Sequence, residues 1–145
     1  MLLGNGHGTF HGASKSQAGP AGTSALFVTA DDFNKDGKLD LLGNGDGTFQ
    51  PVSVYIGLGR DTVELGIGDF NGDHHADVVA LDYTTFDITL FLGNGHGTLQ
   101  TGISFPVGGN PISVVVADFN RDQSTDMAVV SQIPNDISVL LNTGP

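Results

Sequence analysis

An internal repeat constrains the fold of this chain more than any other feature. The pattern Asp-Phe-Asn-x-Asp, with a further Asp four residues later, begins at Asp32, Asp69 and Asp118; we call these nine-residue segments the Asp loops. A second pattern, Leu-Gly-Asn-Gly-x-Gly-Thr followed by Phe or Leu, occupies residues 3–10, 42–49 and 92–99; we call these the Gly turns. The two patterns alternate, the Asp loops 37 and 49 residues apart and the Gly turns 39 and 50 residues apart. Such periods are typical of four-stranded propeller blades.

Short apolar runs of strand length flank both patterns. They are rich in Val, Ile, Leu, Phe and Thr and are bounded by Gly, Asn and Asp, as strands are. They lie before the Asp loops (25–30, 63–68, 112–117), after them (39–42, 78–81, 127–130), before the Gly turns (86–92, 137–141) and after them (48–56, 98–107). The sequence therefore predicts an all-β fold of about three antiparallel four-stranded units of the propeller-blade type. Each Asp loop joins the first two strands of a unit, and each Gly turn joins the last two.

The composition agrees with this fold and excludes several functions. The 145 residues suit one domain, and 22 of them are Gly. The net charge of −11 disfavours nucleic-acid and membrane-surface binding. The chain has no cysteine, so disulfides, thiolate metal sites and cysteine nucleophiles are impossible. Its first residues do not have the pattern of a signal peptide, and no apolar run is long enough to cross a membrane.

The Gly turns are interpreted as tight turns between strands. Asn-Gly and Asp-Gly steps supply the positive φ values that such turns require. The alternative is a loop that cradles phosphate, which needs a helix directly after it, whereas a strand pattern follows Gly47. On the turn interpretation, His7 and His96 are exposed turn residues.

The Asp loops are interpreted as sites for a hard cation. In the first loop, side-chain oxygens fall at positions 1, 3, 5 and 9 (Asp32, Asn34, Asp36, Asp40), and the carbonyl of Lys38 at position 7 can turn inward. Oxygen-only ligands at alternate positions suit calcium, with magnesium second. Carboxylates packed this closely repel one another unless a cation neutralises them. An EF-hand is excluded, because it needs a Glu at position 12 and flanking helices.

The three loops differ in sequence, and other interpretations remain open. Position 6 favours positive φ and holds Gly37, His74 or Gln123, so the third loop, which also contains Arg121, is expected to be weakest. The Asp and Asn side chains could instead only form turns and accept backbone N–H groups. The adjacent His74 and His75 are a weak indication of a transition-metal site. The Phe at position 2 of each loop (Phe33, Phe70, Phe119) is expected to be a core anchor that holds the loop against its own blade.

With both patterns in view, the chain resembles the FG-GAP (VCBS) repeat family, whose repeats form the blades of integrin-α-like β-propellers. The resemblance implies calcium in the loops between first and second strands, and adhesion, ligand binding to protein or glycan, or scaffolding outside the cell. Carried over by position, it assigns these metal ligands: Asp32, Asn34, Asp36, Lys38 and Asp40; Asp69, Asn71, Asp73, His75 and Asp77; Asp118, Asn120, Asp122, Ser124 and Asp126. Up to three calcium ions are expected.

The chain also departs from a complete propeller. Residues 1–24 are expected to end a preceding blade, 25–58 to form a shortened blade, 59–109 a full one and 110–145 a blade without its last strand, which residues 1–12 could supply. Propellers close with four to eight blades. Either the chain is a fragment of a longer propeller, or chains associate through open blade edges.

Three functions follow as hypotheses. The first is a non-enzymatic, calcium-stabilised binding module. The second is the non-catalytic propeller part of a larger secreted hydrolase or lyase; within this chain the segment around Ser14 lacks the Gly-x-Ser-x-Gly elbow, and His11 has no recognisable acid partner. The third is a structural remnant of a truncated propeller that binds nothing beyond calcium.

Overall fold

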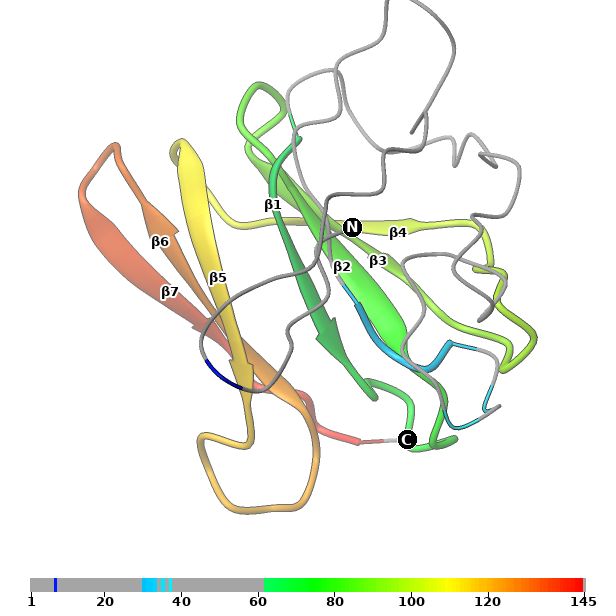
Figure 1. Cartoon of the computed structure of the whole chain (residues 1–145). Helices are drawn as coiled ribbons and strands as arrows, with labels where there is room; N and C mark the ends of the chain where they lie inside the picture. Colours follow the sequence, from blue (N-terminus) through cyan, green and yellow to red (C-terminus); the bar gives the residue numbers. More distant parts are fainter. Residues whose placement is uncertain (1–6, 8–29, 34, 36, 38–61, 145) are drawn as a thin grey trace, which may run out of the picture.

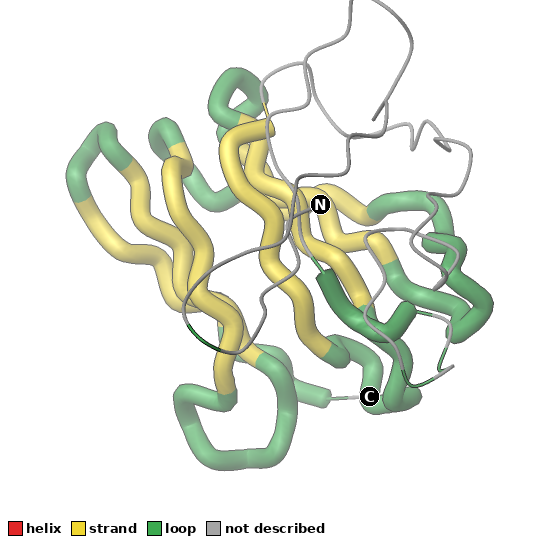
Figure 2. Tube along the Cα trace, in the orientation of Figure 1, coloured by secondary structure: helices red, strands yellow, loops and turns green. Residues whose placement is uncertain are grey.

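Two antiparallel sheets make up the described part of the chain. The computed structural model describes residues 7, 30–33, 35, 37 and 62–144. Their strands are β1 (Thr62–Gly68), β2 (Asp77–Asp82), β3 (Asp87–Phe91), β4 (Ile103–Pro106), β5 (Pro111–Ala117), β6 (Asp126–Ser131) and β7 (Asp136–Leu140). One sheet has the order β1-β2-β3-β4 and the other the order β5-β6-β7 (Figures 1 and 2). The described residues contain no helix. The fold is all-β, as predicted, and has the form of partial propeller blades that do not close.

The strands lie close to the predicted runs, with one exception. β4 covers only Ile103–Pro106 of the predicted 98–107. Before it, Leu99 forms an isolated bridge with Gly93, and the chain then leaves the ladder. A Cβ added at Gly102 would lie 2.4 Å from Thr89 Cγ2, so the chain passes this side chain at close range. The predicted units at 1–24 and 25–58 lie outside the described residues, apart from residues 7, 30–33, 35 and 37.

The second sheet repeats the first three strands of the first sheet. β1 starts at Thr62 and β5 at Pro111, and the same shift of 49 residues relates β2 to β6 and β3 to β7, at both ends of each strand. The register of β1 on β2 shifts between Thr62 and Glu64, and that of β5 on β6 shifts between Pro111 and Ser113. The irregularity therefore belongs to the repeat, as β-bulges commonly belong to a fold.

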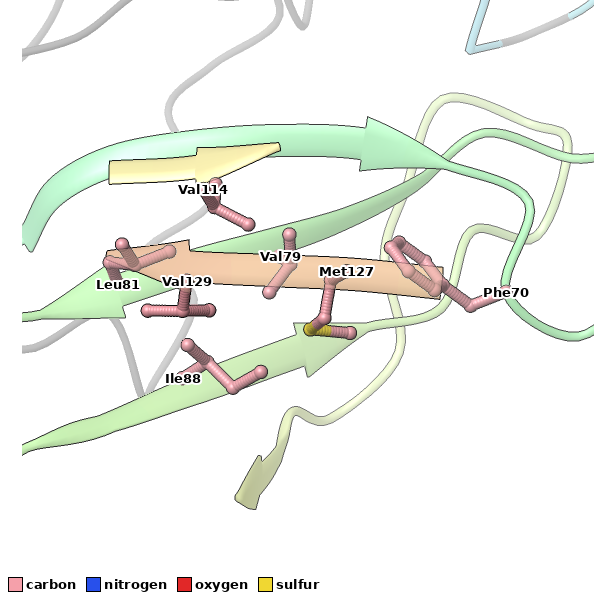
Figure 3. Packing of buried hydrophobic residues seen from close by; sticks show 7 residues of the cluster. All are labelled: Phe70, Val79, Leu81, Ile88, Val114, Met127 and Val129. Atoms are coloured by element: carbon pink, nitrogen blue, oxygen red, sulfur yellow. The ribbon is translucent and has the colours of Figure 1, made fainter. Parts of the chain in front are cut away.

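The main core lies between the two sheets. Its buried members come from both of them and are Phe70, Val79, Leu81, Ile88, Val114, Met127 and Val129 (Figure 3). Leu81 and Ile88 are paired on neighbouring strands, and Val114 is paired with Val129. Each sheet thus contributes alternate residues of its strands to one shared apolar layer.

Strand β2 is buried along its whole length and on both faces. Val79 and Leu81 belong to the layer shared with β5–β7. Val78 and Ala80 belong to a second buried cluster on the other face, together with Phe33 from the first Asp loop. A strand buried on both faces is typical of a sheet stacked between two neighbours.

Strand β1 approaches β5 closely because small residues face the second sheet. A Cβ added at Gly66 would lie 2.9 Å from a methyl group of Val116, and one at Gly68 would lie 2.8 Å from the other methyl group of the same side chain. Glu64, the single glutamate of the chain, accepts a hydrogen bond from the backbone N–H of Val114 through Oε2 (2.6 Å). This bond links two strands of different sheets, and the sequence patterns did not indicate it.

Candidate metal-binding loops

The Asp loops share an unusual backbone conformation. The residues at positions 4 and 6 have positive φ in all three: Lys35 (60°) and Gly37 (83°), Gly72 (74°) and His74 (64°), Arg121 (66°) and Gln123 (72°). The prediction for position 6 is confirmed, including in the third loop, whereas position 4 was not predicted. Position 4 holds Lys, Gly or Arg, and these residue types share no backbone preference from which a positive φ could be predicted. Alternation of right-handed and left-handed residues turns successive backbone N–H groups inward and forms a nest for an anion.

In the loop at residues 69–77, the first carboxylate occupies this nest. Asp69 Oδ1 accepts the N–H of Gly72 (2.8 Å) and Oδ2 accepts that of His74 (2.9 Å). The next oxygen-bearing side chains organise the following turn: Asn71 Oδ1 accepts the N–H of Asp73 (3.0 Å), and Asp73 Oδ1 accepts that of His75 (2.8 Å). Each predicted ligand at positions 1, 3 and 5 is therefore held by the backbone of its own loop.

The loop at residues 118–126 repeats these bonds one for one. Asp118 accepts the N–H groups of Arg121 (2.6 Å) and Gln123 (3.0 Å). Asn120 Oδ1 accepts the N–H of Asp122 (2.9 Å), and Asp122 Oδ1 accepts that of Ser124 (2.8 Å). Despite an Arg and a Gln at the positive-φ positions, the third loop has the same fold as the second.

The first loop is described only in part. Asp32 Oδ2 accepts the N–H of Gly37 (2.8 Å), which is the same bond between positions 1 and 6. Its other predicted ligands, Asn34, Asp36, Lys38 and Asp40, lie outside the described residues.

The Asp at position 9 has a separate role, because it joins the Asp loop to the Gly turn. Asp77 is fully buried, and its carboxylate accepts the N–H of Phe70 (2.8 Å) and that of Gly93, the first glycine of the Gly turn at 92–99 (2.7 Å). Asp126 accepts the N–H groups at the equivalent positions 49 residues further along, those of Phe119 (2.9 Å) and Asn142 (2.8 Å), although Asn142 lies outside the Gly turn pattern. The one-to-one alternation of the two patterns was the sequence signal for this contact, but its geometry was not predicted.

Position 7 also lies against the Gly turn. A Cβ added at Gly95 would lie 2.1 Å from Cδ2 of His75, so the imidazole covers this glycine. The structure adds no support for a transition-metal site at the two histidines. The side chain of His74 is almost fully exposed and lies near Asp69, whereas Nδ1 of His75 lies 2.8 Å from Asp73.

The Phe at position 2 of the first two loops packs against the next unit, and Phe70 also packs against Val79, Leu81 and Ile88 of its own sheet, as predicted. Phe33 and Phe70 are buried, and each packs in the cluster on the upstream face of the next sheet. Their carbonyls accept hydrogen bonds from the next unit, Phe33 from the N–H of Gly97 (3.1 Å) and Phe70 from Nδ2 of Asn142 (2.8 Å). Phe119 is 46 % exposed, so the prediction that it is a core residue is wrong; the described structure places no further sheet against it.

The Gly turn at residues 92–99 is a tight turn, as predicted. Asn94 organises it: its backbone N–H bonds the carbonyl of Thr98 (3.2 Å), and its Oδ1 accepts the N–H of His96 (2.9 Å). Gly95 and Gly97 have positive φ. His96 is exposed, as is His7. A bridge and a strand follow this turn, so the phosphate interpretation fails here.

Hydrogen bonding and burial shift the carboxyl groups in opposite directions. The N–H of His75, aided by the amide of Asn71, lowers the pKa of Asp73, and the N–H of Ser124 and the amide of Asn120 lower the pKa of Asp122. Burial raises the pKa of Asp77, although its two N–H donors act against this. The carboxylates at position 5 are therefore favoured in their ionised form, which a cation requires.

The donor chemistry of the loops fits a hard cation. All side chains at positions 1, 3 and 5 carry oxygen, and each carboxylate oxygen that accepts one N–H retains a further lone pair. Within the described residues, however, no group of three or more His, Asp or Glu side chains converges in a way that could hold a metal ion. A cation would draw on the remaining lone pairs and on the amide and carbonyl oxygens of the loop.

These features define a class of protein: a repeat module built from β-propeller-type blades. Comparison with family models agrees, since residues 69–129 match the FG-GAP-like repeat. The resemblance seen in the sequence is thereby confirmed for this segment, which runs from the second Asp loop into β6. Comparisons with curated proteins and with solved structures give no significant match. The described residues include no helix with the length and apolar character that a membrane span requires.

Proposed function

We propose that this chain is a non-enzymatic, calcium-binding β-propeller repeat module that binds a protein or glycan outside the cell. The observation that carries the proposal is the repetition of one backbone conformation, with positive φ at positions 4 and 6, around the same oxygen-bearing positions in three loops. The same oxygens also accept backbone N–H groups within their loop, and the calcium titration described below separates the two roles.

In the second and third loops, the cation would take its ligands from Asp69, Asn71, Asp73, the carbonyl of His75 and Asp77, and from Asp118, Asn120, Asp122, the carbonyl of Ser124 and Asp126. Calcium is favoured over magnesium, because it accepts six to eight oxygen ligands in flexible geometry. The third loop is proposed to bind more weakly, because Arg121 places a positive charge within it.

An extracellular location is supported by the expected affinity. Asp73 and Asp122 lie at the surface, and their oxygens that already accept N–H groups are expected to bind a cation more weakly. Extracellular modules typically bind calcium with dissociation constants of about 0.1–1 mM. Sites of this strength fill only where calcium is millimolar, which is the condition outside the cell.

The hydrogen bonding of the carboxylates in the described Asp loops supports a non-catalytic role. FG-GAP repeats are generally non-catalytic structural modules, and the carboxylates of the described Asp loops are engaged by backbone N–H groups. General acid–base or nucleophilic catalysis needs convergent groups in a pocket. The binding surface is accordingly proposed to lie on other loops, which the Asp loops keep rigid.

Calcium titration followed by thermal unfolding tests the proposal. Calcium at about 100 times its dissociation constant should stabilise the chain by about 2.7 kcal/mol for each site that it fills, relative to chelator. Asp73→Asn should reduce the calcium-dependent gain, whereas Asp136→Asn, which removes the same charge at the exposed start of β7, should leave it unchanged. An equal gain in both variants, or no gain in the unchanged chain, would contradict the metal assignment.

A further inference from the structure

The second and third Asp loops differ at the residue that follows their asparagine. Asn71 is followed by Gly72, whereas Asn120 is followed by Arg121. In a peptide chain, the backbone nitrogen of the following residue can attack the amide carbon of an asparagine side chain. Glycine favours this attack, because it has no Cβ to crowd the five-membered ring that forms. The two loops, which join β1 to β2 and β5 to β6 at the same end of the sheets (Figure 1), thus present one asparagine with this neighbour and one without it.

The hydrogen bonds around Asn71 place the groups that such an attack needs. The N–H of Gly72, whose nitrogen would attack, donates to Oδ1 of Asp69 (2.8 Å), so a carboxylate lies where its proton must go. Oδ1 of Asn71 accepts the N–H of Asp73 (3.0 Å), which is a donor at the oxygen where negative charge develops. Nδ2 of Asn71, which would leave, donates to Oδ2 of Asp73 (2.9 Å). These bonds fold the amide over the peptide that follows and hold it in one orientation.

The space around Gly72 allows the ring to close. Gly72 is exposed, and a Cβ added to it would meet no atom within 4 Å. The described residues contain one other Asn-Gly pair, Asn94 and Gly95, and there the glycine is buried. A Cβ added at Gly95 would lie 2.1 Å from Cδ2 of His75. The peptide of Gly95 therefore cannot shift toward the side chain of Asn94 without displacing the imidazole.

The loop at residues 118–126 has the same bonds around its asparagine. The N–H of Arg121 donates to Oδ1 of Asp118 (2.6 Å). The N–H of Asp122 donates to Oδ1 of Asn120 (2.9 Å), and Nδ2 of Asn120 donates to Oδ2 of Asp122 (2.8 Å). The residue after the asparagine is therefore the difference between the two loops that bears on the attack, and the chain contains its own matched comparison.

We propose that the loop at residues 69–77 modifies itself at Asn71. The nitrogen of Gly72 forms a bond with Cγ of Asn71, the bond from Cγ to Nδ2 breaks, and the proton of the Gly72 N–H leaves with the departing ammonia. Water then opens the resulting succinimide at either carbonyl and leaves aspartate or isoaspartate at position 71. The loop gains a negative charge at its third position. The proposal does not rest on the proposed calcium sites.

Incubation of the chain in chelator at neutral pH, followed by peptide mapping with mass spectrometry at successive times, tests this. Asn71 should lose its amide at least tenfold faster than Asn94 and Asn120, because its neighbour alone among the three is an exposed glycine. Part of the product should be isoaspartate, which hydrolysis without a succinimide does not give. Equal rates at Asn71 and Asn94 would overturn the proposal, because the Asn-Gly sequence alone would then set the rate.

Exchanging the neighbours of the two asparagines provides a matched pair of variants. Gly72→Arg should slow the conversion of Asn71 at least tenfold, and Arg121→Gly should raise that of Asn120 at least tenfold. Each variant introduces a residue type that already has positive φ at this position in the other loop, so both backbones can be kept. If Asn120 stayed unreactive in the Arg121→Gly variant, the bonds that the two loops share would not promote the reaction, and the proposal would fail.

Discussion

At the scale of single residues, the Asp side chains of this protein divide into distinct roles. The Asp at position 1 fills a nest of backbone N–H groups, and the Asp at position 9 is buried and joins two segments far apart in the sequence. Asp82 has a third role, because its Oδ1 accepts the N–H groups of Thr84 (2.8 Å) and Thr85 (3.0 Å) at the start of the β2–β3 hairpin. Most of these Asp residues therefore shape the backbone, whatever cation the loops bind.

Asp82 gives a pH-dependent prediction. Burial acts to raise its pKa, but the hydrogen bonds from Thr84 and Thr85 outweigh burial and lower it. Because the folded pKa lies below the unfolded value, ionised Asp82 stabilises the fold above the unfolded pKa, and this contribution is lost as the pH falls through the folded pKa. Asp82→Asn should thus destabilise the chain by about 1 kcal/mol at neutral pH.

Urea unfolding at neutral pH and at about pH 3 measures this effect. The difference between the unchanged chain and Asp82→Asn should shrink at the lower pH, where Asp82 begins to bind a proton in both states. Asp136→Asn, at an exposed carboxylate, is the control and should show little difference at neutral pH. A difference for Asp82→Asn that stays constant with pH would refute the role assigned to its ionised form.

At the scale of strands and sheets, the same residue type contributes unequally to stability at equivalent positions of the repeat. Phe70 is buried between two sheets, whereas Phe119 is half-exposed at the end of β5. Phe70→Ala should lower the free energy of unfolding by about 3–5 kcal/mol, because it removes a large buried side chain and leaves a cavity. Phe119→Ala should change it by no more than about 0.5 kcal/mol.

Equilibrium unfolding of both variants, at a concentration where the chain sediments as a monomer, checks this pair. Equal losses for the two variants would mean that a further segment covers Phe119 in solution.

The strands were predictable from the sequence because they are local features, but the contacts between them were not. Apolar runs bounded by Asp and Gly located β1, β2 and β5 to within one or two residues. The bond of Asp77 to Gly93 joins residues 16 apart, and that of Glu64 to Val114 joins residues 50 apart. Such contacts depend on how sheets stack, which a pattern in one segment does not contain. The error over Phe119 has the same origin, since burial at position 2 depends on the next unit.

At the scale of the whole molecule, charge opposes folding. The net charge of −11 includes nine Asp residues in the three Asp loops, and self-repulsion destabilises a compact chain. Three divalent cations would reduce the net charge to −5.

A salt series in chelator isolates this repulsion. Raising KCl from about 10 mM to about 150 mM shortens the screening length from about 30 Å to about 8 Å and should raise the melting temperature by a few degrees. Calcium added at the higher salt concentration should raise it further, and more than magnesium does, because site binding is distinct from screening. A melting temperature that does not respond to KCl would show that the acidic loops are too far apart to repel one another.

The bond from Asp77, the ninth residue of the second Asp loop, to the Gly turn at residues 92–99 has a consequence for how such repeats change length. It fixes one end of the first three strands of a unit, so residues added there would displace a buried carboxylate from its two donors. The hairpins β2–β3 and β6–β7 lie at the opposite end of these strands and are largely exposed. Insertions should therefore be tolerated at those hairpins and rejected at the Asp loops.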